Sequence, residues 1–461
     1  YCSDPNNSYA QNLIPGQTYF IRVYSSGTAI LQDTTFDLCV SIPPPPPAND
    51  ECINAITLTV NPNTSCTIFS AGTVTSATQS PQANTCAGIA NDDVWYQFTA
   101  TSQAHTVDLN NVVGSTTNLN HAVYTSTNPT DPCANLTLLY CSDPNSSYNN
   151  TFVVGQTYYI RVFTSGNVLG STANFNICVG SIAPPIATNN TQYTVPQLVE
   201  DILINSTCAI VSNITWSTGT NFGSTNGIGY FQENSSGFPF EDGIVMTTGN
   251  ALNAPGPNLT ILSDGGGGTW GGDADLEAII LAATGQAMNS QNASKIEFDF
   301  IPLTDFISFN FLFASDEYGT FQCSFSDAFA FLLTNVATNT TTNLALIPNT
   351  TTPISVVTIR NQLYNAGCAS VNPEYFAFYY GAGGVNPLGA PINFNGVTVP
   401  MTASATVIPN ANYKIKMVVA DRSDTAYDSA VFLEGGSFEL GDLDLGVDLL
   451  ISSGNAICPA D

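Results

Sequence analysis

The 461-residue sequence predicts an all-β protein, in which tandem disulfide-stapled β-sandwich modules precede a larger β-sandwich or jelly-roll-like domain with one short helix. Short runs of alternating apolar and polar residues, separated by Gly, Asn, Asp and Pro, indicate strands and turns. A long internal repeat indicates tandem modules. The 12 cysteines, in a chain rich in Asn, Thr and Ser, favour an extracellular setting with structural disulfides.

The repeat divides the first part of the chain. The segment YCSDPNNSYAQNLIPGQTYFIRVYSSG returns, little changed, as YCSDPNSSYNNTFVVGQTYYIRVFTSG at residues 140–166. We therefore expect a complete module at residues 48–182, and only the C-terminal part of another copy in residues 1–42. Residues 43–47, PPPPP, predict a stiff polyproline spacer of roughly 15 Å. The rest of the first copy is expected before Tyr1, in a longer protein.

Alternation within the complete module predicts the strands of a β-sandwich. Every second residue is apolar in VWYQF (94–98), and the same rule holds in TYYIRVF. Arg161 lies on the opposite face of this second run and is the only Lys or Arg of the module. We expect it to form a structural ion pair with Asp92 or Asp93, and the alternative is a ligand-binding role.

The complete module contains six cysteines, which allow 15 pairings. Cysteines close in sequence suggest two local staples, and the remaining two would join the ends of the module. The expected pairs are Cys133–Cys141, Cys66–Cys86 and Cys52–Cys178. Cys2 and Cys39 correspond to Cys141 and Cys178, so their partners are expected before Tyr1.

Residues 186–441 form a different domain that is still mostly β. Strands are predicted in KIEFDFI, FISFNFLFA, DAFAFLL, YKIKMVVA and AVFLEGGSFEL. ADLEAIILAATG, Ala274–Gly285, has helical spacing, acidic residues in its first turn and Gly at its end, and it predicts the one short helix. Residues 442–461 begin a new apolar stretch and are expected to start a further Ig-like module.

Acidic residues interrupt the apolar strands of this domain. In FASDEYGTFQCSFSDAFAF, parity places Glu317 on the face of the preceding phenylalanines and Asp327 on the face of the following ones, while Asp421 continues an apolar face of the next long strand. Uncompensated carboxylates at the rim of a core cost several kcal/mol or become neutral. Calcium, which binds oxygen ligands at strand-end loops, would remove this cost. The candidate ligands are Asp316, Glu317, Asp327, Asp421, Asp424 and Asp428. Cys323, in the same loop, is expected to pair with Cys368.

Two alternatives remain for these carboxylates. They could cap turns and accept backbone hydrogen bonds, or pair with Arg422 or Arg360. They could also include a catalytic pair, because two carboxylates suffice for glycoside hydrolysis. The only histidines, His105 and His121, lie outside this domain, and the chain has no phosphate loop or dinucleotide fingerprint. We therefore expect a protein that is not an enzyme, with no catalytic residues.

Composition limits the partners. The 35 acidic and 7 basic residues give a formal net charge of −28, which disfavours nucleic acid and anionic membranes. No run of 18 apolar residues is present, so direct membrane insertion is not expected.

Several motifs of the large domain, in order, resemble the choice-of-anchor L domain: GIVMTTGN, GGDADLEAI, FNFLFASDEYGTF with FSDAFAFLL, NLALIP and YKIKMVVADRSDTAYDSAVFLEGGSF. That family implies an exported bacterial surface protein and no established activity. ANDEC, DDVWYQFTAT, GQTYYIRV and FNICV resemble modules of secreted Bacteroidetes proteins, many of which leave by type IX secretion. This resemblance also implies possible O-glycosylation after Asp, at Thr34, Thr425 and Ser429.

Together these observations predict a segment of a long, filamentous adhesin at a bacterial cell surface, similar to the large surface adhesins of gliding bacteria. The small modules would form a stalk beside neighbouring domains of the same chain. The large domain would bind a surface, a glycan or a protein. The alternatives are a secreted glycan hydrolase with accessory β-sandwich domains and a purely structural filament subunit.

Overall fold

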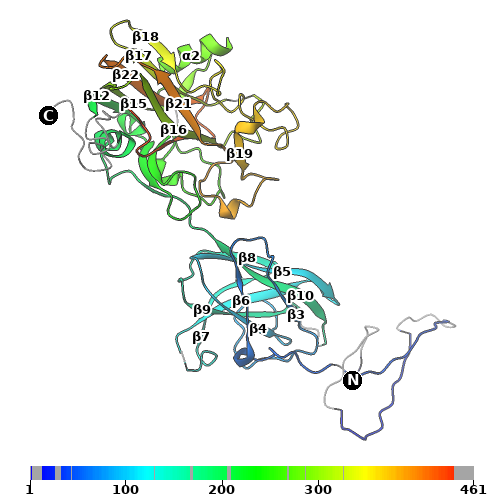
Figure 1. Ribbon diagram of the computed structural model, residues 1–461. Coiled ribbons are helices and arrows are strands. Elements are labelled where there is room, and N and C mark those ends of the chain that lie inside the picture. Colours follow the sequence, from blue (N-terminus) through cyan, green and yellow to red (C-terminus); the bar gives the residue numbers. More distant parts are fainter. Residues whose placement is uncertain are drawn as a thin grey trace. The chain divides into compact units, whose positions relative to one another are not determined.

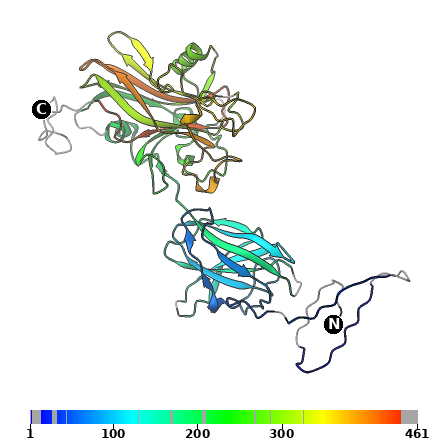
Figure 2. The same ribbon diagram turned by 45° about the vertical axis from the view of Figure 1, so that its right-hand side comes forward.

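The computed structural model describes residues 2, 13–25, 33–42, 44–128, 130–166, 170–204, 209–266, 269–285, 287–324 and 326–440. The chain divides into two compact units, Tyr1–Ile182 and Ala183–Asp461, and each is described by itself. Both units are built mainly from β-sheets, as the sequence predicts (Figures 1 and 2).

The complete module is a sandwich of two five-stranded sheets. One sheet has the order β1 (Ile56–Thr57), β4 (Val94–Thr99), β9 (Thr157–Thr164), β6 (Leu119–Ser126) and β7 (Leu136–Ser142). The other contains β2 (Val60–Asn61), β10 (Ala173–Ile182), β5 (Ala104–Gly114) and β8 (Ser146–Asn149), with β3 (Ser70–Thr73) also paired to β10. A 3₁₀ turn, Cys52–Asn54, precedes β1. The alternating residues predicted to face inward, Val94, Tyr96 and Phe98, are buried in the core between the sheets.

The described parts of residues 1–42 form no strand, although their sequence matches β9 and β10. In the complete module, β9 pairs with β4 and β6. Residues 1–42 contain no counterpart of either partner, and a lone strand leaves its backbone hydrogen-bonding groups unpaired. The apolar side chains of this segment are accordingly exposed, including Phe20 at 96%. Cys2 and Cys39 are exposed and free.

The three disulfides of the complete module differ from the expected pairs. They join Cys52 to Cys133, Cys66 to Cys178 and Cys86 to Cys141. The pairings Cys133–Cys141, Cys66–Cys86 and Cys52–Cys178 were therefore wrong. In the large domain, Cys323 is joined to Cys368, which is the expected pair.

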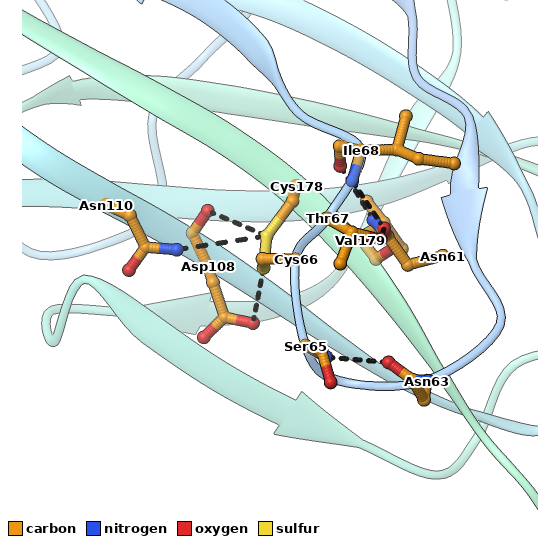
Figure 3. The surroundings of a disulfide bond; sticks show 10 residues. All are labelled: Asn61, Asn63, Ser65, Cys66, Thr67, Ile68, Asp108, Asn110, Cys178 and Val179. Carbon is orange, nitrogen blue, oxygen red and sulfur yellow. Dashed lines mark hydrogen bonds between the residues drawn. A yellow bond between two sulfur atoms is a disulfide. The ribbon is translucent and has the colours of Figure 1, made fainter.

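Strand pairing explains why the disulfides could not be predicted from the closeness of cysteines in the sequence. β2 and β3 both pair with β10, at Val179 and Ile177 respectively, so the loop between them passes over Cys178 and places Cys66 there. Figure 3 shows this crossing, with Asp108 of β5 beside the sulfurs. The other two disulfides lie on the outer face of the first sheet, where Cys52, Cys86 and Cys133 pack with Trp95. All three bonds connect segments that are distant in sequence, with separations of 81, 112 and 55 residues.

The large domain contains two sheets. The larger has the order β11 (Ala187–Asn189), β13 (Ile228–Gln232), β14 (Asp242–Thr247), β23 (Ser429–Glu434), β16 (Phe306–Ser315), β20 (Gly396–Thr398) and β19 (Phe376–Tyr379), with β21 (Met401–Thr406) also paired to β16. The smaller has the order β12 (Ile210–Ser217), β15 (Ser290–Ile301), β22 (Tyr413–Arg422), β17 (Ala328–Asn335) and β18 (Thr340–Asn343). The expected β-sandwich is present.

The predicted helix is α2, Ala274–Thr284, with the Asp273 side chain accepting hydrogen bonds at its start and Gly285 in the left-handed conformation at its end. A second helical segment was not predicted. It comprises α1 (Val195–Gln197) and a π-helix, Leu198–Ile204, which buries Leu198 and Leu203 against the sheets. Short 3₁₀ turns occupy Gly219–Phe222, Ala251–Asn253, Pro373–Tyr375 and Pro387–Gly389.

Phenylalanines of the two sheets meet in the core of this domain. Phe309 and Phe311 of β16 pack against Phe331 of β17 with ring centroids 4.9 and 5.0 Å apart, and Phe313 stacks on Phe329 at 5.1 Å. All five are at most 1% exposed. Each such burial contributes about 1.5–3 kcal/mol. This core fixes where β16 and β17 end, and so where the acidic residues lie.

Candidate functional site

Five of the six predicted metal ligands are buried at one end of this sandwich. Ser315 of β16 is paired with Ser429 of β23, and Ala328 of β17 with Ala420 of β22. The Ser429 hydroxyl donates to Asp327, which precedes β17, so the acidic residues beside these positions lie at the same end of both sheets. Their exposed fractions are 0% for Asp316, Asp421 and Asp428, 1% for Asp327 and 2% for Glu317. The sixth, Asp424, is exposed and accepts a hydrogen bond from the Ala426 N–H in its own turn. We call the five buried residues the acidic cluster.

Two members of the acidic cluster each accept two hydrogen bonds from the protein. Asp316 accepts the backbone N–H groups of Leu262 at 2.8 Å and Asn395 at 2.9 Å. Asp327 accepts the Arg422 N–H at 2.9 Å and the Ser429 hydroxyl at 2.7 Å. For these two residues the capping alternative holds.

The other three members retain unpaired oxygens. Both carboxylate oxygens of Asp421, Oδ1 of Asp428 and Oε2 of Glu317 are buried without a hydrogen-bond partner. The second Asp428 oxygen accepts the Asp264 N–H at 3.0 Å. A buried acceptor without a partner costs about 1–3 kcal/mol, and more if it is charged. These four oxygens are therefore the part of the cluster that protein contacts do not explain.

Burial raises the pKa of every member of the acidic cluster. The pKa is raised to about 7 for Asp327, about 8 for Asp316 and about 9 for Glu317 and Asp428, and it lies well above its ordinary value for Asp421. Repulsion between the carboxylates adds to the effect of burial: Asp327 and Asp428, for example, both raise the pKa of Asp421. Without a compensating positive charge, protonation is the cheaper state of the cluster.

Asp264 belongs beside the cluster, and sequence reasoning missed it. Its side chain accepts the Asn250 N–H at 2.6 Å and a hydrogen bond from the Asn253 amide. A Cβ built on Gly249 would lie 2.1 Å from Asp264 Oδ1 and 2.0 Å from Asp428 Oδ2, so these two oxygens flank a space that only glycine leaves open. Asp264 was not among the predicted ligands, although an Asp directly before a glycine run was the available signal.

The geometry limits how a cation could bind. Among the described residues, no three carboxylates bring oxygens within 4.8 Å of one another. The one set of three potential ligands that are this close is Cys66, Cys178 and Asp108, and its two sulfurs form the disulfide of Figure 3. Calcium accepts six to eight oxygens, including backbone carbonyls and water. A calcium ion at the acidic cluster would therefore combine a pair of carboxylates with such neutral ligands.

The other predicted positions have simpler roles. Arg161 is 0% exposed and forms two hydrogen bonds with Asp93, from Nε at 3.0 Å and from NH2 at 3.1 Å, and its guanidinium lies over the Trp95 ring. This is the expected structural ion pair. In the large domain, Arg360 donates to the carbonyl oxygens of Ala369 and Gln322.

The three proposed glycosylation positions differ in exposure. Ser429 is 0% exposed, and its hydroxyl donates to Asp327, so burial excludes its modification in the folded chain. Thr425 is half-buried and Thr34 is exposed. The calls on residues 43 and 442–461 lie outside the described residues.

Comparisons with known proteins define the class. Residues 48–177 match a galactose-binding-domain-like family associated with type IX secretion, and residues 187–439 match the choice-of-anchor L domain. The chain is thus a secreted cell-surface protein, and both matching families are non-catalytic, which fits a protein that is not an enzyme. The choice-of-anchor L match covers more than half of the 461 residues, so the chain belongs to the choice-of-anchor L family.

Similarity to solved structures is weak. A putative secreted protein from Eubacterium rectale is 9% identical, with 76% of this chain and 71% of that chain covered and a TM-score of 0.16. Tandem CBM51 modules of a family 98 glycoside hydrolase from Streptococcus pneumoniae are 9% identical, with 76% and 82% covered and a TM-score of 0.17. PNGase F, a glycosylasparaginase from Flavobacterium meningosepticum, is 11% identical, with 80% and 97% covered and a TM-score of 0.15. Scores this low carry no argument.

A search of curated protein sequences returned no match. In the described part of the chain, no helix is both long and apolar enough to cross a membrane.

Proposed function

We propose that the chain is part of an extracellular adhesin, whose large domain attaches to an external partner and is held in its binding shape by calcium at the acidic cluster. The observation that carries the proposal is the set of four buried carboxylate oxygens without a partner. A doubly charged cation would satisfy the oxygens of a pair of these carboxylates and weaken the repulsion within the cluster.

The position of the acidic cluster links calcium to adhesion. Asp316 holds the loops that contain Leu262 and Asn395, and Asp327 holds the end of β22 through Arg422. Phe321 and Tyr427 pack edge to face at 4.7 Å beside the cluster. A cation here would stiffen several strand-end loops at once, and loops on a rigid scaffold are where binding residues concentrate.

The hydrolase alternative has no observation in its favour. The carboxylates of the cluster are at most 2% exposed, whereas a glycoside hydrolase presents both carboxyl groups to its substrate. Substitution of Glu317 or Asp327 is therefore expected to change stability and calcium binding. It is not expected to abolish a hydrolytic activity.

Thermal unfolding of the full chain tests the calcium part of the proposal. Calcium at ten to a hundred times its Kd would stabilise the folded state by about 1.4–2.7 kcal/mol, so Tm should be higher in about 1 mM CaCl2 than in EGTA. Asp421→Asn should abolish this difference, whereas Asp305→Asn, which removes one exposed carboxylate outside the cluster, should retain it. Equal Tm values in CaCl2 and EGTA, or a wild-type response in the Asp421 variant, would contradict it.

Bead binding tests the adhesion part. Beads coated with the full chain should attach to glass or to a mucin layer more strongly in CaCl2 than in EGTA. Beads coated with the Asp421→Asn variant should not show this difference. Absence of attachment on every surface would favour the purely structural filament subunit.

A further inference from the structure

The large domain has a cavity of about 370 Å³ next to the acidic cluster. Two segments form its walls, Asn258–Ile261 and Tyr380–Pro387, and Asn395 closes one side. Its volume falls in the range of about 300–1,000 Å³ that is usual for small-ligand sites.

The lining combines apolar surfaces with amide groups. Tyr380 lies in the wall and stacks on the half-exposed Phe378, with ring centroids 6.1 Å apart and planes inclined by 28°. Leu259, Ile261 and Val385 add apolar side chains, which are 55%, 46% and 44% exposed. These exposed residues are an apolar surface that water covers in the free protein, and a ligand with an apolar face would bury it.

The amides supply directional contacts. Asn258 donates from Nδ2 to Asn395 Oδ1 at 3.1 Å, while Asn258 Oδ1 is buried and has no partner. This oxygen is therefore an unsatisfied acceptor beside the cavity. Asn395 is itself held by the acidic cluster, because its side-chain amide donates to the Asp316 carbonyl at 2.9 Å.

A glycine-rich turn leaves the mouth of the cavity open. The turn contains Gly381, Ala382, Gly383 and Gly384, and Gly383 has a φ of +86°, which favours glycine. A side chain at Gly384 would collide with the backbone carbonyl of Tyr379, at 1.9 Å. The backbone conformation and close packing of the turn therefore require glycine at Gly383 and Gly384. Because these residues have no side chain, the mouth of the cavity is open to a ligand.

Charge selects the ligand class. None of the described residues that line the cavity is charged, and the acidic cluster lies behind its wall. The formal net charge of −28 also repels anions. An uncharged ligand with many hydroxyls and one apolar face matches the amides, the Thr260 hydroxyl and the exposed apolar side chains of the lining, and a sugar ring has this combination.

We propose that this cavity is a binding site for a neutral saccharide. The inference rests on the proposed function, because it makes a neutral saccharide the external partner of the adhesin. It also assigns the acidic cluster a role in binding, since Asp316 accepts the N–H groups of both Leu262, which follows one wall, and Asn395. Loss of order in the cluster would therefore move the Asn258–Ile261 wall and the side that Asn395 closes.

A glycan array and titration calorimetry test the proposal on the full chain. The array carries neutral and sialylated oligosaccharides, and the neutral oligosaccharide that binds best is then titrated. Ala382→Trp places a large side chain at the mouth and should weaken this binding at least tenfold. The matched control is Ala337→Trp, at an exposed position in the turn between β17 and β18, which should bind as the wild type does. Hydrogen exchange of the strands checks that both variants are folded.

Several outcomes would overturn the inference. They are the absence of binding to any neutral saccharide, binding to sialylated glycans only, and equal affinity of the Ala382→Trp variant and the wild type. The last outcome would place the saccharide in residues 48–177, the galactose-binding-domain-like module. If saccharide binding fails while Tm and bead attachment still respond to calcium, only this inference falls. If the calcium response fails while the cavity variant still loses saccharide binding, the calcium proposal falls instead.

Discussion

Acidification from pH 6.5 to pH 4 is expected to destabilise the complete module through His121. This side chain is 0% exposed, its Nε2 lies 2.6 Å from the Ser147 hydroxyl, and its Nδ1 is buried without a partner. Burial lowers the pKa of His121 from its ordinary 6.5 to about 4, because the imidazolium has no compensating carboxylate.

The sign and size of the effect follow from this pKa. As the pH falls below 6.5, the unfolded chain binds a proton at His121, whereas the folded chain does so only near pH 4. Stability is therefore lost across this interval and is fully present above it. At about 1.36 kcal/mol per pKa unit, the loss reaches about 3 kcal/mol.

The measurement compares the wild type with His121→Gln, in which this titration is absent. The full chain is unfolded in urea, and unfolding is monitored by the hydrogen exchange of peptides from β6 and β9. This readout reports on the complete module separately from Ala183–Asp461. The free energy of unfolding should fall by about 3 kcal/mol more in the wild type than in the variant between pH 6.5 and 4. His105, whose pKa burial also lowers, titrates in both proteins and cancels. Parallel pH profiles for the two proteins would refute the reasoning.

Two further predictions concern the same module. Asp93→Leu leaves the buried Arg161 guanidinium without its carboxylate and should lower the free energy of unfolding by about 3–5 kcal/mol. The double variant with Arg161→Met should recover part of this loss. Additive losses in a double-mutant cycle would argue against a coupled pair. Removal of the Cys86–Cys141 disulfide, which spans a sequence separation of 55, should cost about 4 kcal/mol in urea unfolding. A peptide map that links Cys133 to Cys141 would contradict this connectivity.

The strands and the helix were predictable because their signals are local. Apolar residues at every second position identified β4, β9, β16, β17 and β22. Helical spacing, acidic residues in the first turn and a terminal Gly identified α2. The same parity placed Asp421 on the inward face of β22. The helical segment that contains Leu198 and Leu203 was missed, since it is short and its apolar residues are fixed by packing against the sheets.

The disulfides were less predictable for a related reason. Sequence gives the spacing of cysteines, but strand pairing decides which of them become neighbours. Cys66 meets Cys178 because β2 and β3 both pair with β10. The Cys323–Cys368 pair was the easier case, because few cysteines competed for it in the large domain.

The sequence by itself determined the all-β class, the division near residue 182 and the position of carboxylates at the ends of apolar strands, because each of these follows from local composition and order. Its motifs also carried the resemblance to the choice-of-anchor L family. Only the tertiary structure decided which carboxylates are hydrogen-bonded and which are not. It showed Asp316 and Asp327 with backbone partners, Asp421 with none, and Asp264 added from a glycine-rich loop. The physical reason is that a hydrogen bond or a desolvation cost depends on which segments pack together, and β-sheets bring together segments far apart in the chain.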